Sequence, residues 1–234
     1  MIVTDGLVVR GFTPPLALAD FGLAAFDMDS TLITIECIDE IASVAGRGAE
    51  VAAITEAAMR GEIADYKESL RLRVSLLKGV PATALQTVYD DRLRFNPGAE
   101  RLVAACRNAG LKTLLVSGGF TFFTDRVRDR LDIDFTRSNV LGIEAGHLTG
   151  RMVDQPWGDI CDSAEKRRML LDTCASLGVP PSRSIAVGDG ANDLPMMAAA
   201  GLSVAFHGKP KVREAAMVAI DEGGLDRLFE VVTP

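Results

Sequence analysis

A short apolar run that ends in two carboxylates constrains the fold of this chain more than any other feature. Residues 21–26 read Phe-Gly-Leu-Ala-Ala-Phe, and residues 27–31 read Asp-Met-Asp-Ser-Thr. The apolar run is typical of a buried strand, and open α/β sheets hold their ligands at the carboxyl ends of such strands. Two buried carboxylates need a cation or several donors to keep their charge. The pattern therefore favours a divalent metal ion beside Asp27 and Asp29.

The same two acids also have a purely structural interpretation. In an isolated Asp-x-Asp motif, Asp29 or Ser30 more often only caps the helix that follows. Residues 132–134 read Asp-Ile-Asp, yet no apolar strand precedes them and no Ser-Thr pair follows them. The position at the end of a strand is what distinguishes residues 27–31 from a simple cap.

A second apolar run, residues 184–187, also ends in paired acids. It is followed by Gly188-Asp189-Gly190-Ala191-Asn192-Asp193. A dinucleotide-binding loop would need a third glycine at position 193, and an acid there would repel a pyrophosphate. Mg²⁺ prefers a few carboxylate and carbonyl oxygens together with waters. This segment therefore predicts acids that serve a metal ion.

A third apolar run ends in a hydroxyl group and glycines. Residues 114–120 read Leu-Leu-Val-Ser-Gly-Gly-Phe and precede a helical pattern. Backbone N–H groups at a turn here, together with the Ser117 hydroxyl, would suit an oxyanion, although a plain helix N-cap explains the motif equally well. Lys166 begins a further helical segment and could supply a positive charge. Taken alone, such a lysine usually lies on a solvated face.

In this order and spacing, the four motifs resemble those of the haloacid dehalogenase superfamily of aspartate-nucleophile phosphotransferases. Within it the chain is similar to the phosphoserine phosphatase family, from Leu23 to the C-terminus. Residues 34–41 resemble the family segment whose glutamate, Glu36 here, faces the amino group of the substrate. Residues 68–79 resemble the run whose second arginine, Arg73, binds the substrate carboxylate. The resemblance implies hydrolysis of O-phospho-L-serine to L-serine and phosphate through an aspartyl phosphate, the last step of serine biosynthesis.

The resemblance also implies a role for each matching residue. Asp27 is expected to be the nucleophile, and Asp29 the general acid and then the general base. Ser117 and Lys166 are expected to bind the transferring phosphoryl group, and Lys166 counts as a catalytic residue as well. Gly118 and Asn192 are expected to bind the substrate, with Asn192 orienting either its phosphate or the rest of the molecule. Mg²⁺ is expected on Asp27, Asp29 and Asp189, with Asp193 behind them. One departure concerns residues 59–66, which are one residue longer than usual and end in Tyr66 where phenylalanine is commoner, so the shape of the pocket wall can differ.

The pattern of apolar runs predicts an α/β fold. Strands are expected at 23–27, 112–117, 184–188 and 202–205, and helices near 98–109, 120–131, 166–176 and 209–216. Such alternation indicates a mainly parallel, Rossmann-like sheet covered on both faces. Residues 33–95 show only helical patterning and are expected to form a four-helix cap inserted into a core of residues 1–32 and 96–234. Residues 139–150 have hairpin chemistry and are expected to form a flap beside the site.

Composition limits the partners and the compartment. The chain has 234 residues, with 25 basic against 32 acidic ones, a net charge of −7 that argues against a nucleic-acid or anionic-membrane surface. The four cysteines have no C-x-x-C spacing, so neither a zinc site nor a redox motif is expected, as fits a reducing cytoplasm. The first 20 residues lack the pattern of a signal peptide, and no apolar stretch is long enough to span a bilayer. A small phosphomonoester is the expected partner.

Three other functions stay open at this point. The chain could transfer the phosphoryl group to an alcohol such as homoserine, because water and an alcohol would use the same aspartyl phosphate. It could accept phosphate on aspartate without turnover, as a response-regulator receiver does, although a complete substrate cap argues against this. A catalytically silent scaffold has little support while every motif is intact. Whether the protein is a monomer or a homodimer cannot be read from the sequence.

Overall fold

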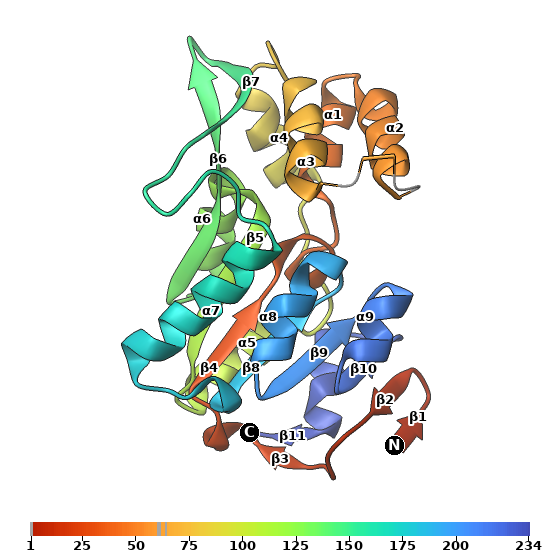
Figure 1. Cartoon of the computed structure of the whole chain (residues 1–234), viewed down its shortest axis with the longest axis vertical. Helices are drawn as coiled ribbons and strands as arrows, with labels where there is room; N and C mark the ends of the chain where they lie inside the picture. Colours follow the sequence, from red (N-terminus) through yellow and green to blue (C-terminus); the bar gives the residue numbers. More distant parts are fainter. Residues whose placement is uncertain (1, 60–61, 64) are drawn as a thin grey trace.

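The computed structural model of the chain describes residues 2–59, 62–63 and 65–234. Within this part, a nine-stranded sheet forms the centre of the molecule (Figure 1). Its strands follow one another in the order β1 (Ile2–Thr4), β2 (Leu7–Val9), β10 (Val218–Ile220), β9 (Leu202–Phe206), β8 (Ser184–Gly188), β4 (Leu23–Phe26), β5 (Lys112–Phe120), β6 (Phe135–Glu144) and β7 (His147–Val153). A separate pair is formed by β3 (Leu16–Ala17) and β11 (Val232–Thr233).

The middle of the large sheet is parallel, as the sequence predicts. Strands β10, β9, β8, β4, β5 and β6 run parallel to their neighbours. Strands β1, β2 and β7 join the two edges antiparallel. The N-terminal strands were not predicted, because three residues are too few to show an alternating pattern.

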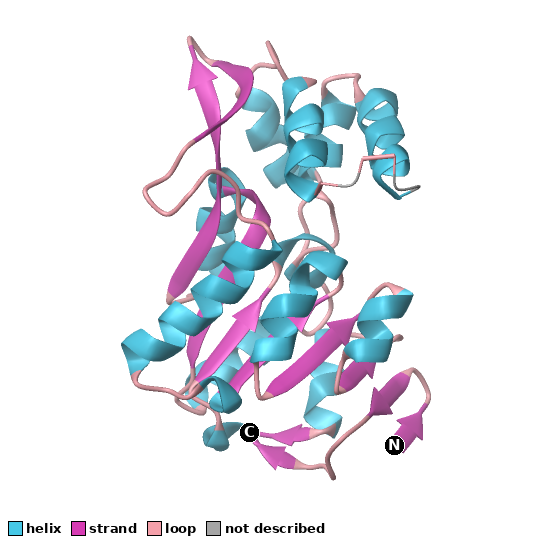
Figure 2. Ribbon diagram, viewed as in Figure 1, coloured by secondary structure: helices cyan, strands magenta, loops and turns pink. Residues whose placement is uncertain are grey.

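Helices cover both faces of the sheet (Figure 2). On β4, Ala24 and Phe26 face one apolar core, which includes residues of α5 (Ala99–Asn108) and α6 (Thr121–Leu131). Leu23 and Ala25 face the other, which includes residues of α7 (Ser163–Leu177), α8 (Leu194–Ala199) and α9 (Pro210–Ala215). A strand buried on both sides reads as a continuous apolar run, and this explains residues 21–26.

Four helices stand above the carboxyl ends of the central strands (Figure 1). They are α1 (Cys37–Val44), α2 (Gly48–Met59), α3 (Tyr66–Ser75) and α4 (Thr83–Asp91). The hairpin of β6 and β7 rises beside them and is longer than the predicted 139–150. Its strand β7 pairs with the linker between α3 and α4, because the Gly79 N–H donates to the Leu148 carbonyl and the Leu148 N–H donates to the Val80 carbonyl, both at 2.8 Å. The hairpin and the four helices are thus joined by backbone bonds.

The cysteines and the helix lengths bear on the expectations about thiol chemistry and membrane spans. The cysteines Cys37, Cys106, Cys161 and Cys174 are all free and buried. Among the described residues, no helix combines the length and the apolar character that a membrane span needs.

Candidate active site

The sheet register brings three of the predicted motifs to one place. Phe26, the last residue of β4, pairs with Val187 of β8 on one side and with Leu115 of β5 on the other. Asp27 follows directly, and its N–H donates to the Val187 carbonyl at 3.0 Å. Because the three strands are parallel neighbours, the residues that follow them meet at the same edge of the sheet.

The chain turns sharply after β4 and directs two acids toward one cavity. Ser30 has a φ of 56°, in the left-handed region that non-glycine residues seldom adopt. Its hydroxyl donates to Glu36 Oε1 at 2.7 Å, which closes the turn. The Met28 N–H donates to Asp27 Oδ1 at 2.7 Å. Asp27 and Asp29 therefore come from one short segment, in which Asp27 caps the turn Met28–Leu32 while Asp29 and Ser30 have non-helical backbone angles.

Lys166 lies beneath Asp27 and is completely buried. Helix α7 begins earlier than predicted, because Asp162 caps it by accepting a hydrogen bond from the Glu165 N–H at 2.9 Å. The Lys166 ammonium lies 2.8 Å from Asp27 Oδ1 and 2.7 Å from Asp193 Oδ1. Burial by itself lowers the pKa of Lys166, but the two carboxylates outweigh it and raise that pKa well above its usual range. The ammonium has three donors, so one stays available for a ligand.

The carboxylates of Asp27, Asp189 and Asp193 form an acidic cluster whose oxygens lie within 4.8 Å of one another. Both oxygens of Asp193 are already engaged. Oδ1 accepts from Lys166, and Oδ2 accepts from the N–H groups of Asp189 at 3.1 Å and Gly190 at 3.0 Å. Burial, the Asp193 charge and the Glu36 charge raise the pKa of Asp189 to about 6. Three carboxylates against the Lys166 ammonium and the nearby Lys209 charge still leave an excess of negative charge, which is compatible with a divalent cation.

The Ser117 loop is an irregular part of a strand. Strand β5 continues to Phe120, but its pairing with β6 shifts register between Val116 and Phe120, at the glycines where a turn was expected. On β6, the buried Asn139 supports this segment, because it donates to the Gly118 carbonyl at 2.7 Å and accepts from the Cys161 N–H at 2.8 Å. Ser117 is buried and its hydroxyl oxygen accepts from the Gly119 N–H at 2.9 Å. The hydroxyl proton is therefore free to donate to a ligand.

Asp29 is buried like Asp27 but has different neighbours. Its Oδ1 is buried and has no hydrogen-bond partner among the described residues. Burial and the nearby Glu36 charge raise the pKa of Asp29 to about 8. A side chain at Gly119 would come within 2.9 Å of Asp29 Oδ2, so the glycine permits this close approach. Asp29 thus carries a proton at neutral pH and can donate it.

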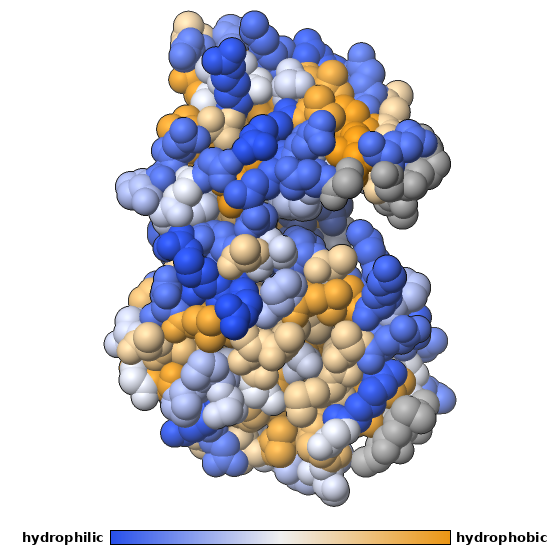
Figure 3. Space-filling model, in the orientation of Figure 1, coloured by the Kyte–Doolittle hydropathy of each residue, from blue (hydrophilic) through white to orange (hydrophobic). Residues whose placement is uncertain are grey.

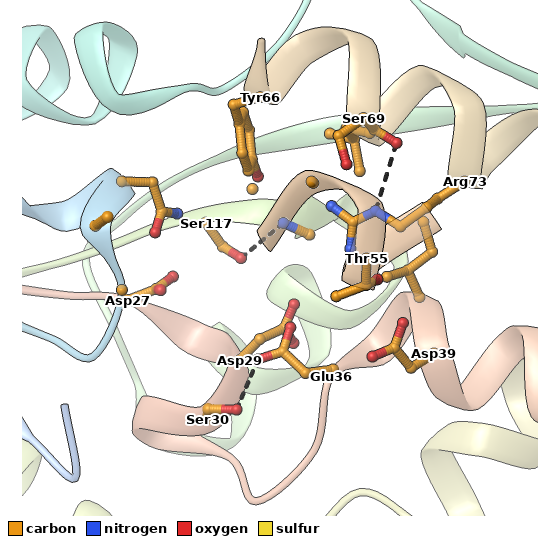
Figure 4. A pocket seen from close by; sticks show the side chains of 18 of the residues that line it. Asp27, Asp29, Ser30, Glu36, Asp39, Thr55, Tyr66, Ser69, Arg73 and Ser117 are labelled. Carbon is orange, nitrogen blue, oxygen red and sulfur yellow. Dashed lines mark hydrogen bonds between the residues drawn. The ribbon is translucent and has the colours of Figure 1, made fainter. Parts of the chain in front are cut away.

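These groups open into a cavity of about 730 Å³ between the sheet and the four helices. Hydrophilic side chains cover much of the narrow middle of the molecule at this level (Figure 3). Arg73 reaches in from α3, and its contact with the Ser69 carbonyl is long at 3.4 Å (Figure 4). The predicted residues that line the cavity are Asp27, Asp29, Glu36, Arg73, Ser117, Gly118, Asp189 and Asn192. Lys166 and Asp193 lie beneath it, joined to Asp27 by the ion pairs.

Some residues of the site were missed or only partly covered by sequence reasoning. Asn139 was read only as part of a hairpin, and no local signal shows that it supports the Ser117 loop. Asp39 lies in segment 34–41 and lines the cavity, and its buried Oδ1 has no hydrogen-bond partner within the described part of the chain. The unusual length of residues 59–66 cannot be followed, because residues 60, 61 and 64 lie outside the described part. The other Asp-x-Asp motif is structural, since Asp134 accepts from Lys112 and Thr113.

Comparison with known proteins agrees with this geometry. A family model for haloacid dehalogenase-like hydrolases matches residues 21–201. A curated phosphoserine phosphatase of Polaromonas sp. is 72% identical to the chain, and the alignment covers 98% of each. One of Albidiferax ferrireducens is 70% identical, over 99% of this chain and 98% of the relative.

Solved structures show the same relationship. A phospho-aspartyl intermediate analogue of phosphoserine phosphatase has a TM-score of 0.82 and 36% identity, and the match covers 90% of this chain and 98% of that one. A substrate-bound phosphoserine phosphatase complex has a TM-score of 0.80 and 34% identity, over 90% of this chain and 97% of that one. The chain therefore belongs to the phosphoserine phosphatase family of the haloacid dehalogenase-like hydrolases.

Proposed function

We propose that this chain hydrolyses O-phospho-L-serine to L-serine and phosphate, with Asp27 as the nucleophile. One observation carries the proposal: two carboxyl groups of a single loop line one cavity and differ in their partners. The buried Lys166 ammonium lies 2.8 Å from Asp27 Oδ1 and opposes the rise that burial causes in the pKa of Asp27, whereas Asp29 Oδ1 has no hydrogen-bond partner among the described residues and the pKa of Asp29 is raised to about 8. A carboxyl group paired with a cation and one that favours its protonated form can serve as nucleophile and proton donor in one reaction.

In the first step, the Asp27 carboxylate attacks phosphorus and the phosphorus–oxygen bond to serine breaks. Asp29 gives its proton to the departing serine oxygen and becomes a carboxylate. Asp27 Oδ1 already accepts from the Met28 N–H and from Lys166, which fixes the orientation of the carboxylate before attack. The product of this step is an aspartyl phosphate on Asp27 and free L-serine.

In the second step, water hydrolyses the aspartyl phosphate. The Asp29 carboxylate left by the first step takes a proton from the water, which attacks phosphorus and restores the Asp27 carboxylate. Asp29 ends the cycle protonated, as it began. Its buried Oδ1, which lacks a partner among the described residues, suits such a proton carrier.

We assign the binding of the phosphoryl oxygens to donors that surround Asp27. The Ser117 hydroxyl, the Gly118 N–H, the remaining Lys166 donor and the Asn192 amide are the candidates. A helix or loop that presents such donors in advance stabilises the charge that develops during transfer. The excess charge of the acidic cluster fits Mg²⁺ held by the Asp27 and Asp189 side chains and the Asp29 carbonyl, with Asp193 behind them. When bound, the ion would neutralise the repulsion between carboxylate and phosphate.

The amino-acid part of the substrate is assigned to the helical side of the cavity. Glu36 would pair with the ammonium group and Arg73 with the carboxylate, since both line the cavity that contains Asp27. Residues 33–95 would then act as a cap on a core of residues 1–32 and 96–234, so that the substrate bridges the two. An enzyme for this small metabolite is expected to work in the cytoplasm as a monomer or homodimer, without nucleic-acid or membrane partners.

Phosphate release from a panel of phosphomonoesters with Mg²⁺ tests the proposal. The panel contains O-phospho-L-serine, phosphoethanolamine and 3-phosphooxypropionate, with and without added homoserine. O-Phospho-L-serine should be cleaved far better than the other two, and serine and phosphate should appear in equal amounts. Formation of phosphohomoserine in place of free phosphate would instead identify a phosphotransferase. Stable phosphorylation without release would identify a phosphate-accepting module.

A further inference from the structure

Tyr66 extends from the helical side of the cavity to the Ser117 loop. It is the first residue of α3, directly after Asp65, which caps the helix by accepting from the Lys67 N–H at 3.1 Å. Its partly buried ring packs against the larger apolar core, and its hydroxyl points down toward the loop (Figure 4). A Cβ atom on Gly118 would lie only 2.1 Å from the Tyr66 hydroxyl oxygen. The hydroxyl therefore rests directly against the loop that we assign to phosphoryl binding.

Ion pairs fix the first turns of α3 on the other side of the site. The Lys67 ammonium lies 2.9 Å from Asp159 and 3.5 Å from Asp162, and Arg71 also pairs with Asp159. Asp162 caps α7, the helix that carries Lys166. The position of Tyr66 is thus tied both to the Ser117 loop and to the helix of the catalytic lysine.

The Tyr66 hydroxyl has donor capacity that the protein does not use. Within the described part of the chain, no hydrogen bond involves it, although it lines the cavity. Burial raises the pKa of Tyr66 further above its usual range, so the group stays protonated and can donate. A half-buried hydroxyl without an acceptor is unfavourable unless a ligand or water supplies one. The nearby positive charges of Lys166 and Arg73 favour an anionic acceptor.

We propose that the Tyr66 hydroxyl donates a hydrogen bond to a phosphoryl oxygen of the bound substrate. This inference rests on the proposed function and adds a direct contact from the helical part of the site to the transferring group. The phosphoryl group is the favoured partner of the two anionic parts, because the hydroxyl lies against Gly118 and the Lys166 charge acts on it more strongly than the Arg73 charge. A bound phosphoryl group would thus form a hydrogen bond with the first residue of α3.

The test compares Tyr66→Phe with Tyr89→Phe, the matched change at the other of the two tyrosines in the chain. Tyr89 lies on α4 and contacts Arg126, away from the residues that line the cavity. Tyr66→Phe should lower kcat/KM for O-phospho-L-serine by about tenfold to a hundredfold, the range for losing one hydrogen bond to a charged group. It should weaken inhibition by inorganic phosphate by a similar factor and leave inhibition by L-serine unchanged. Tyr89→Phe should match the wild type in all three.

Two results would overturn the inference while leaving the phosphatase assignment intact. One is an active Tyr66→Phe enzyme with wild-type kcat/KM and wild-type inhibition by phosphate. The other is weaker inhibition by L-serine alone, which would place the hydroxyl on the amino-acid part. A wild-type enzyme that does not cleave O-phospho-L-serine would instead remove the proposed function itself.

A second pair of variants tests the position of the hydroxyl even if Tyr66→Phe folds poorly. In the wild type, Gly118→Ala places a methyl group against the hydroxyl, but without that oxygen the nearest ring atom is 3.3 Å away. Gly118→Ala should therefore lower kcat/KM by a smaller factor in the Tyr66→Phe background than in the wild type. Equal factors in the two backgrounds would show that the hydroxyl does not rest on Gly118, and would overturn the inference.

Discussion

The Lys166 ammonium lies 2.8 Å from the Asp27 carboxylate at a point where the lysine side chain is fully buried. Burial and the neighbouring Asp193 charge raise the pKa of Asp27, and the ammonium opposes that rise. The pair therefore has two functions, because the ammonium favours the charged form of Asp27 in a desolvated place and also fixes the direction of its side chain. Each function predicts a different measurable effect.

The covalent step is tested by Asp27→Asn. The amide has nearly the same shape but is not a nucleophile, so turnover should fall by at least about a thousandfold, as for other essential nucleophiles. The fold should survive, because Lys166 keeps its second partner, Asp193, at 2.7 Å. Steady-state kinetics and the circular dichroism spectrum check both statements. A variant with more than about a tenth of the wild-type rate would remove Asp27 as the nucleophile.

The contribution of the Lys166–Asp27 ion pair to stability is tested by Lys166→Met. This change leaves Asp27 and Asp193 buried without their cation, and breaking a buried ion pair in this way costs about 3–5 kcal/mol. Lys112→Met is the control, because Lys112 pairs with Asp134 while its side chain is 52% exposed. An exposed pair is worth about 1 kcal/mol or less. Urea unfolding of both variants with Mg²⁺ removed should show this difference, and equal losses would contradict it.

The main features of the site could be predicted from the sequence because each motif follows a strand. Once β8, β4 and β5 are parallel neighbours, the acids that follow β4 and β8 and the hydroxyl that ends the apolar part of β5 must meet at one edge. The contact between Lys166 and Asp27 could not be derived in this way. It depends on how α7 packs on the sheet, and a lysine in a helical segment looks the same whether it is buried or solvated.

Other details were set by distant contacts that leave no local pattern. The glycines after Ser117 predicted a turn, and β5 is irregular there, but its register shift against β6 and the hydrogen bond from Asn139 to the Gly118 carbonyl depend on the neighbouring strand. The three-residue strands β1 and β2 are stabilised by pairing with each other and with β10, not by their own sequence. In both cases the partner is far away in the chain.

The role of Asp29 predicts an alkaline limb in the pH profile, that is, a decrease of kcat/KM at high pH. Its pKa of about 8 means that the proton is present below pH 8 and is lost above it. Since the first step needs that proton, kcat/KM for O-phospho-L-serine should fall as the pH rises through about 8. Asp29→Asn should abolish the limb. It should lose less activity toward 4-nitrophenyl phosphate than toward O-phospho-L-serine, because the 4-nitrophenolate leaving group needs little protonation. Asp39→Asn, a change at another carboxyl group of the cavity, should keep the limb.

The acidic cluster predicts how metal removal changes stability with pH. The pKa of Asp189 is raised from 3.8 to about 6, so the folded protein binds this proton more tightly than the unfolded chain. In metal-free protein, the resulting penalty is fully present above pH 6 and is relieved as the pH falls toward 4, by up to about 3 kcal/mol. Mg²⁺ should therefore raise Tm more at pH 8 than at pH 5, and Asp189→Asn should reduce this difference. An equal rise at both pH values would contradict the assigned metal site.

Chelation should have a matching effect on activity. EDTA should abolish phosphate release and Mg²⁺ should restore it. Ca²⁺ should support little activity, because its larger and looser coordination shell can take both oxygens of Asp27 and occupy the attacking one. Full activity in protein that elemental analysis shows to contain no metal would contradict the proposed dependence on Mg²⁺.

Specificity tests the two charged residues on the helical side of the cavity. Glu36 and Arg73 line the same space as Asp27, and a ligand that lacks the partner of either charge leaves that charge unpaired. The penalty for such a loss is about 2–5 kcal/mol in a desolvated site. Phosphoethanolamine lacks the carboxylate, so it should be a poor substrate of the wild type, and Arg73→Ala should weaken O-phospho-L-serine hydrolysis much more than phosphoethanolamine hydrolysis.

Glu36→Gln should show the complementary pattern with 3-phosphooxypropionate, which lacks the ammonium group. Its activity toward this analogue should stay near the low wild-type level, while its activity toward O-phospho-L-serine falls. The measurement is kcat/KM for the three substrates on the three proteins. If Arg73→Ala lowered O-phospho-L-serine and phosphoethanolamine hydrolysis by the same factor, Arg73 would contact the phosphoryl group or only support α3. The assignment of the carboxylate to Arg73 would then be wrong, even though the chemistry at Asp27 would be unaffected.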